Sequence, residues 1–122
     1  MTTICPTITA AEPHAYRTQA ERLEQFAGRW HIDVADGVLA PRQLVSLDQL
    51  WWPGNVWVDL HVMYQDPSRH LELFIAQHPQ LIIIHAEAEG NFTQWEQALH
   101  RHGIQVGVAL LPDTPVSTIA GA

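Results

Sequence analysis

The 122-residue sequence contains no lysine and only one cysteine, and it has no long uninterrupted apolar segment. Without lysine, chemistry that needs a side-chain amine, such as Schiff-base formation, is excluded. Cys5 alone cannot form an internal disulfide bond, so nothing in the sequence requires an oxidising compartment. No segment approaches the roughly 18 apolar residues of a membrane span, and the first residues lack the pattern of a signal peptide. We therefore expect a cytoplasmic protein without a membrane partner.

Positive charge is also scarce, because six arginines stand against 13 acidic residues and give a formal net charge of −7. Such a surface repels polyanions, so we expect no nucleic-acid partner. With 47% hydrophobic residues and five tryptophans, the chain has the composition of one globular domain with a real core. Its eight histidines exceed the usual share and supply candidates for metal ligation or acid–base catalysis.

Short runs rich in β-branched residues alternate with segments of helical periodicity, which is the pattern of an α/β fold. The five predicted strands cover residues 3–9, 30–35, 56–63, 81–85 and 105–110. The four predicted helices cover about residues 13–28, 43–51, 67–78 and 91–102, and the first ends at Gly28, a residue suited to a left-handed helix terminus. Single helices between short strands imply parallel pairing through right-handed crossovers.

Polar side chains interrupt two of the predicted strands at alternate positions. His31 and Asp33 share one face of their strand, as do Asp59, His61 and Met63 of the next strand. Ionisable groups inside a sheet cost several kcal/mol each unless they are paired, hydrogen-bonded or bound to a metal. Two interpretations follow from the residues alone: a Zn, Mn or Fe site near the strand ends, or a buried His–Asp pair without a metal.

Five segments, in the same order and at matching spacings, resemble the ribulose-phosphate 3-epimerase family. They are CPTITA, HIDVADGVLAP, VDLHVM, IIIHAEAE and HGIQVGVALLPDTPVSTI, and the match extends from about Ile4 to Ile119. The resemblance implies an α/β fold of the (β/α) TIM-barrel type. The chain would hold strands one to five, or about four and a half βα units with parallel strands, as a single truncated ribulose-phosphate-binding domain over residues 1–122.

The resemblance also implies an activity, which is metal-assisted epimerisation at C3 between D-ribulose 5-phosphate and D-xylulose 5-phosphate. By this resemblance Asp33 is a catalytic acid/base group and, together with His31 and His61, a ligand of a divalent metal, Zn, Mn or Fe. Thr7, His61 and Met63 would contact the sugar phosphate substrate. These assignments would make the protein an isomerase of carbohydrate metabolism.

The sequence departs from the family pattern at several positions. Thr7 stands where the family has a serine, and Ala35 stands where the family has a second methionine. His85 matches a family histidine that is not a metal ligand, so we expect it to support the site rather than to do chemistry. The family's second acid/base group, an Asp on the seventh strand, and its glycine-rich phosphate loops have no counterpart in this sequence.

Two interpretations remain open from these departures. In the first, two copies form a homodimer that closes a barrel-like assembly, and epimerisation takes place only there. In the second, the chain is a catalytically inactive half-barrel homologue that acts as a metal-binding or oligomerisation module. A different ketose phosphate would keep the chemistry and change only the pocket.

Overall fold

One parallel sheet of five strands, in sequential order, forms the centre of the computed structural model, which describes residues 4–119. The strands are β1 (Thr7–Ile8), β2 (Arg29–Ala35), β3 (Trp57–Met63), β4 (Leu81–His85) and β5 (Gln105–Ala109). This arrangement confirms the predicted α/β class and the partial (β/α) barrel. The first strand is shorter than predicted, and Thr3, its predicted first residue, lies outside the described part of the chain.

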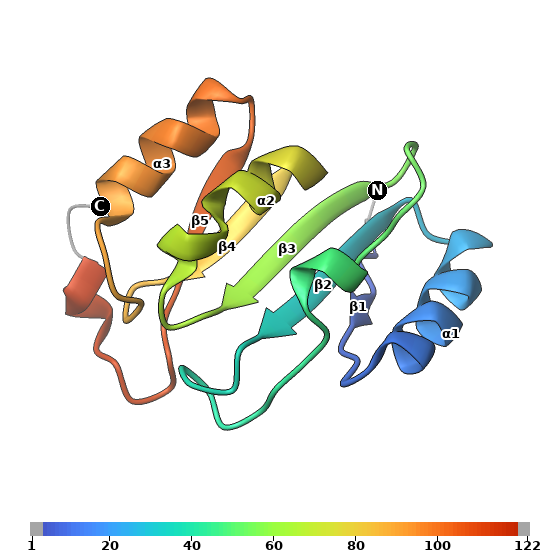
Figure 1. Cartoon of the computed structure of the whole chain (residues 1–122), viewed down its shortest axis with the longest axis horizontal. Coiled ribbons are helices and arrows are strands. Elements are labelled where there is room, and N and C mark those ends of the chain that lie inside the picture. Colours follow the sequence, from blue (N-terminus) through green and yellow to red (C-terminus); the bar gives the residue numbers. More distant parts are fainter. Residues whose placement is uncertain (1–3, 120–122) are drawn as a thin grey trace.

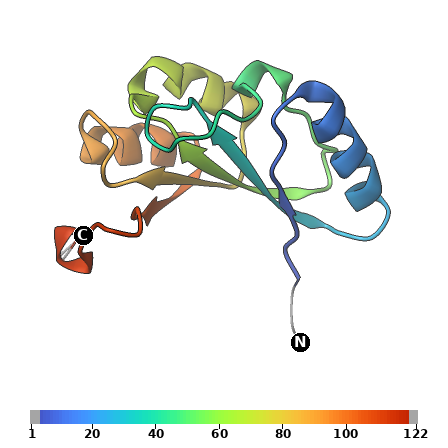
Figure 2. The same ribbon diagram turned by 90° about the horizontal axis from the view of Figure 1, so that it is seen from below.

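Three α-helices cover one side of the sheet. They are α1 (Pro13–Glu24), α2 (Leu71–Gln77) and α3 (Phe92–Arg101), and short 3-10 segments are η1 (Leu47–Gln49), η2 (Pro67–His70) and η3 (Val116–Ile119). Figure 1 shows the three α-helices in front of the sheet, and in Figure 2 they lie above it, while the opposite face carries no α-helix of residues 4–119. None of the helices among residues 4–119 is long and apolar enough to cross a membrane.

The alternation of side chains along the strands explains why only one face is covered. Successive side chains point to opposite faces, so Val, Ile and Trp of β2 to β4 pack under the helices. The fully buried ones are Trp30, Ile32, Val34, Val58, Leu60, Val62, Ile82 and Ile84. Burying one such side chain contributes about 1.5–3 kcal/mol, so this layer anchors the helices to the sheet. The other face, called the open face below, holds the intervening side chains.

Helix α1 begins as its sequence predicts and ends earlier. The Glu12 carboxylate accepts hydrogen bonds from the backbone N–H groups of His14 and Ala15, at 3.1 and 2.7 Å, and Pro13 occupies the first helical position. The prediction that Gly28 ends this helix in a left-handed conformation was wrong, because α1 stops at Glu24 and Gly28 does not have a positive φ. The Gly28 carbonyl instead accepts a hydrogen bond from the backbone of β3, which places it in the sheet ladder.

The prediction of a helix over residues 43–51 was also wrong, because only the 3-10 segment η1 forms there. The Leu44 and Val45 backbone N–H groups donate to the carbonyls of Ala35 and Ala10, at 3.2 and 2.9 Å. Those long-range bonds keep the segment extended, and they bury the same apolar side chains whose spacing resembles a helix. The last helix, α3, ends where predicted, with Gly103 at a φ of 76° just beyond it.

Candidate functional site

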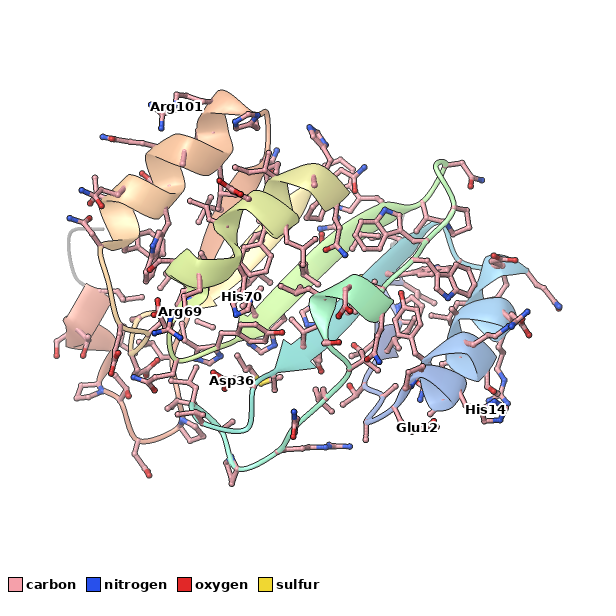
Figure 3. The ribbon with its side chains drawn as sticks, in the orientation of Figure 1. Glu12, His14, Asp36, Arg69, His70 and Arg101 are labelled. Carbon is pink, nitrogen blue, oxygen red and sulfur yellow. The ribbon has the colours of Figure 1, made fainter. Side chains whose placement is uncertain are left out.

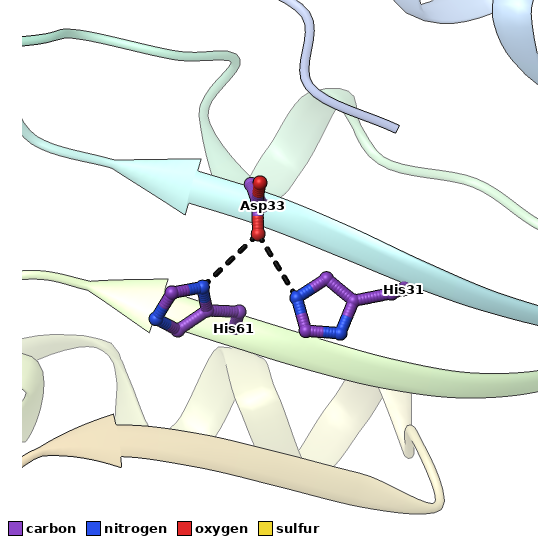
Figure 4. A group of neighbouring side chains, drawn as sticks. All are labelled: His31, Asp33 and His61. Atoms are coloured by element: carbon purple, nitrogen blue, oxygen red, sulfur yellow. Dashed lines mark hydrogen bonds and ion pairs between the residues drawn. The ribbon is translucent and has the colours of Figure 1, made fainter. Parts of the chain in front are cut away.

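Two neighbouring strands bring an aspartate and two histidines together on the open face. Parallel pairing of β2 with β3 sets Asp33 beside His61, and His31 lies two residues earlier on the same face of β2. The Asp33 Oδ1 atom lies 3.1 Å from His31 Nε2 and 3.0 Å from His61 Nδ1 (Figure 4). All three side chains are partly exposed, so a ligand arriving at the open face can reach them.

The donor atoms of this triangle fit a divalent metal ion. One atom from each of His31, Asp33 and His61 lies within 4.8 Å of the others, and among residues 4–119 this is the one group with such spacing. Bonds of about 2.0–2.2 Å to nitrogen and oxygen hold tetrahedral ligands roughly 3–3.5 Å apart, which is close to the observed separations. Two imidazoles with one carboxylate suit Zn, Mn or Fe.

Asp33 is held as an ionised carboxylate. Its second oxygen, Oδ2, accepts a hydrogen bond from the Thr9 hydroxyl at 2.8 Å. Burial raises the pKa of Asp33, but its polar contacts with His31, His61 and Thr9 outweigh burial and hold this pKa well below its usual range. The hydrogen bond to Asp33 in turn raises the pKa of His31. The carboxylate is therefore unprotonated at neutral pH and carries the negative charge that binds a cation.

A chain of hydrogen bonds continues from the triangle to the end of the sheet. His61 Nε2 lies 2.8 Å from Nε2 of His85, and the two rings stack with their centroids 5.0 Å apart. His85 Nδ1 lies 3.3 Å from Oε1 of Glu87, whose Oε2 accepts a hydrogen bond from the Leu111 backbone N–H at 2.8 Å. Burial lowers the pKa of His85, with a further contribution from His61, which favours the neutral imidazole.

A second polar cluster lies on the open face near the amino ends of the strands. Asp59 is only 6% exposed, and its Oδ2 accepts hydrogen bonds from Nε and Nη2 of Arg29, at 3.0 and 2.9 Å. Its Oδ1 accepts a hydrogen bond from the Trp57 indole N–H at 2.7 Å. Cys5 Sγ lies 3.9 Å from the same carboxylate, and burial raises the pKa of this thiol. The cluster is thus a saturated ion pair rather than an open ligand set.

The other predicted site residues lie on the same face without a hydrogen bond to the triangle. Thr7 of β1 is exposed and pairs in register with His31, and Met63 at the end of β3 pairs with Ala35. Sequence reasoning missed Thr9, although its spacing of two from Thr7 puts it on the same face.

Glu87 was missed for a different reason. It lies two residues beyond the end of β4, so the alternation of strand side chains no longer predicts where it points. Its contact with the segment after β5 depends on the folded path of two separate loops. No local pattern in the sequence signals that contact.

Comparison with known proteins identifies relatives along almost the whole chain. The model of the Ribulose-phosphate 3 epimerase family matches residues 3–121. Ribulose-phosphate 3-epimerases of Treponema pallidum and Bacillus subtilis are each 28% identical, over 97% and 98% of this chain and 56% and 57% of their own lengths. The Helicobacter pylori enzyme is 35% identical over 73% of this chain and 42% of its own length. The chain therefore spans about half the length of the curated relatives it matches.

Proposed function

The chain belongs to the ribulose-phosphate 3-epimerase family, and from this premise we propose that it forms one partial ribulose-phosphate-binding barrel domain with an epimerase site. The reaction is the inversion of C3 in a pentulose 5-phosphate, which interconverts D-ribulose 5-phosphate and D-xylulose 5-phosphate. The observation that supports this most is the triangle of His31, Asp33 and His61 on the open face, with Asp33 ionised between two imidazoles.

In this proposal the triangle holds a divalent metal, Zn, Mn or Fe, through His31, Asp33 and His61. When bound, the ion would polarise the carbonyl oxygen next to the carbon that loses its proton. A carboxylate and two imidazoles within 4.8 Å of one another support such a site.

Asp33 is the acid/base group of the described residues. Asp33 is unprotonated at neutral pH, as a base must be before it takes the C3 proton of the substrate from one face. The Thr9 hydroxyl fixes the carboxylate plane by its 2.8 Å hydrogen bond to Oδ2. Inversion also needs a second acid/base group on the opposite face of the substrate carbon. In this proposal a second copy of the chain supplies that group.

The substrate would lie over the open face, in contact with Thr7, His61 and Met63. His61 is itself a member of the triangle, and Met63 follows it by two residues on the same face of β3. Thr7 is exposed beside His31, so its hydroxyl is free to contact a polar group of the sugar phosphate.

We further propose that a second copy of the chain covers the open face as a homodimer. Within residues 4–119, β1 and β5 are the two outer strands, and each has one edge that no other strand of the sheet pairs with. A two-fold axis parallel to the strands would bring β5 of each copy beside β1 of the other with all strands parallel. Light scattering after size exclusion should give twice the 13.7 kDa chain mass. A single 13.7 kDa species at micromolar concentration would exclude this assembly.

The function is tested by hydrogen exchange at C3 in D2O, followed by NMR with Zn, Mn or Fe added. Exchange of deuterium into ribulose 5-phosphate requires one acid/base group, whereas the appearance of xylulose 5-phosphate requires two. We expect exchange with the natural chain and none with Asp33→Asn, while Asp48→Asn, an exposed aspartate on η1, behaves like the natural chain.

The outcomes of this experiment separate the two interpretations of the chain. Exchange without inversion would indicate that the second acid/base group is absent from the assembled protein. Metal binding without any exchange above the Asp33→Asn background would contradict the epimerase proposal and support a non-catalytic metal-binding module.

A further inference from the structure

Glu87 is held in place by backbone on one side and contacts an imidazole on the other. Its Oε2 accepts the hydrogen bond from the Leu111 N–H, in the segment that follows β5, at 2.8 Å. Its Oε1 lies 3.3 Å from His85 Nδ1. An ionised carboxylate has only acceptor sites, so His85 Nδ1 must carry the proton of this hydrogen bond.

The position of that proton sets the direction of the next hydrogen bond. A neutral imidazole with its proton on Nδ1 can only accept at Nε2. His85 Nε2 lies 2.8 Å from His61 Nε2. His85 is only 4% exposed, so water does not easily replace His61 as its hydrogen-bond partner. His61 must therefore donate from Nε2, which leaves an electron pair on its Nδ1.

That electron pair points at Asp33. His61 Nδ1 lies 3.0 Å from Asp33 Oδ1, an atom that also offers only electron pairs. Two acceptors at this distance need a cation beside both, which is a metal ion or a second proton on the ring. If His85 instead donated from Nε2 to His61, its Nδ1 would carry no proton and would face the Glu87 carboxylate as a second acceptor.

We propose that Glu87 and His85 are positioning residues that fix the His61 tautomer, with its proton on Nε2 and its Nδ1 free to bind the metal. This inference rests on the metal site of the proposed function. The inference extends the site from three residues on β2 and β3 to His85 at the end of β4 and to the loops that follow β4 and β5. Residues of this kind around a metal-binding histidine fix its tautomer and ring orientation.

Glu87→Gln tests the inference because it reverses the donors and acceptors of the hydrogen bonds from residue 87 to His61, with little change in side-chain shape. The Leu111 N–H would hold the amide oxygen, so the amide NH2 would face His85 Nδ1 as a donor. His85 would then carry its proton on Nε2, and His61 would have to turn its proton to Nδ1, where it competes with the metal. We expect the dissociation constant for Zn²⁺ or Co²⁺, measured by competition with a chelating dye, to rise about 10- to 100-fold.

Glu89→Gln is the matched control, because Glu89 is exposed, follows Glu87 by two residues and loses the same charge. We expect its dissociation constant to stay within about twofold of the natural chain. If Glu87→Gln binds the metal as tightly as this control, the positioning role is wrong while the metal site stands. If the natural chain binds neither ion, the metal site and the inference that rests on it are both wrong.

A second measurement uses the natural chain and does not depend on how well the variant folds. In the Zn²⁺-loaded protein, ¹⁵N NMR of the histidine rings should show a proton on Nε2 of His61 and on Nδ1 of His85. A proton on His85 Nε2, or metal bound at His61 Nε2, would overturn the inference.

Discussion

Asp33 and Asp59 lie on the same face of neighbouring strands, and each has three side-chain polar contacts of 3.1 Å or less, yet their partners differ in kind. Asp59 is bound by Arg29, whose guanidinium does not lose its proton, and by the indole of Trp57, which can only donate. Asp33 is bound by His31, by His61 and by the Thr9 hydroxyl. The difference lies in whether the partners can give up a proton.

The neighbours of each aspartate therefore decide what it can do. The Asp59 cluster has a permanent ion pair, and Arg29 also lies over the Trp57 ring at 5.2 Å, so its partners are fixed. The imidazoles beside Asp33 are partners of another kind, because an imidazole nitrogen can carry either a proton or a metal ion. The same residue type, on the same face, thus stabilises the sheet at one end and supplies a candidate reaction centre at the other.

The largest expected difference between the two aspartates is in metal affinity. Asp33→Asn replaces the central charged ligand by a neutral amide, so we expect affinity for Zn²⁺ or Co²⁺ to fall by more than about 100-fold, beyond the loss caused by an outer partner. Asp59→Asn should leave affinity within about threefold of the natural chain. Competition titration of both variants checks this, on samples whose circular dichroism shows a folded protein. Equal losses would mean that the two clusters are not functionally distinct.

Asp59→Asn should show its main effect in stability instead. The variant removes the negative charge that faces Arg29 and replaces one acceptor oxygen by an NH2 group that faces another donor, which we expect to cost about 2 kcal/mol of the free energy of unfolding. Arg29 is 40% exposed, so water recovers part of its solvation and keeps the cost below that of a fully buried pair. Urea unfolding measures it, and the double variant with Arg29→Met should lose less than the sum of the two single changes. Additive losses would show that the pair is uncoupled.

The fold and the triangle were predictable from the sequence, whereas the connections around the triangle were not. Alternation along β2 and β3 put His31, Asp33 and His61 on one face, and parallel pairing in register then brought Asp33 beside His61. The prediction for residues 43–51 failed because the apolar spacing there fits a helix, whereas the backbone N–H groups donate hydrogen bonds to segments far away in the sequence. Glu87 was not predictable, because its partner at Leu111 belongs to another loop.

Asp36, at the end of β2 (Figure 3), extends the comparison to a carboxylate whose partners are backbone N–H groups. Burial raises its pKa, but hydrogen bonds from Gln65, Val38 and Leu39 outweigh burial and lower it below the usual 3.8. Because the folded pKa is lowered, this stabilisation is present above about pH 4 and is lost as the pH falls through the folded pKa.

We therefore expect Asp36→Asn to cost about 1.5 kcal/mol at pH 7 and clearly less near pH 2. Urea unfolding at both pH values checks this, with metal affinity as the second readout. A cost that does not change with pH would show that the charge of Asp36 contributes little to stability. A large loss of metal affinity would mean that Asp36 belongs with the triangle.

The smallest expected effect comes from the partner of Asp33 that is not a histidine. Thr9→Val keeps the β-branched shape and removes only the hydroxyl that donates to Asp33 Oδ2, so we expect a loss of about 1 kcal/mol at pH 7. The hydrogen bond lowers the pKa of Asp33, so its loss raises that pKa and moves the acid loss of stability to higher pH. Thr7→Val, two residues earlier and exposed, is the control and should change stability by less than about 0.5 kcal/mol. Urea unfolding between pH 2 and pH 7 distinguishes the two, and equal curves for both variants would mean that Thr9 does not hold the Asp33 carboxylate.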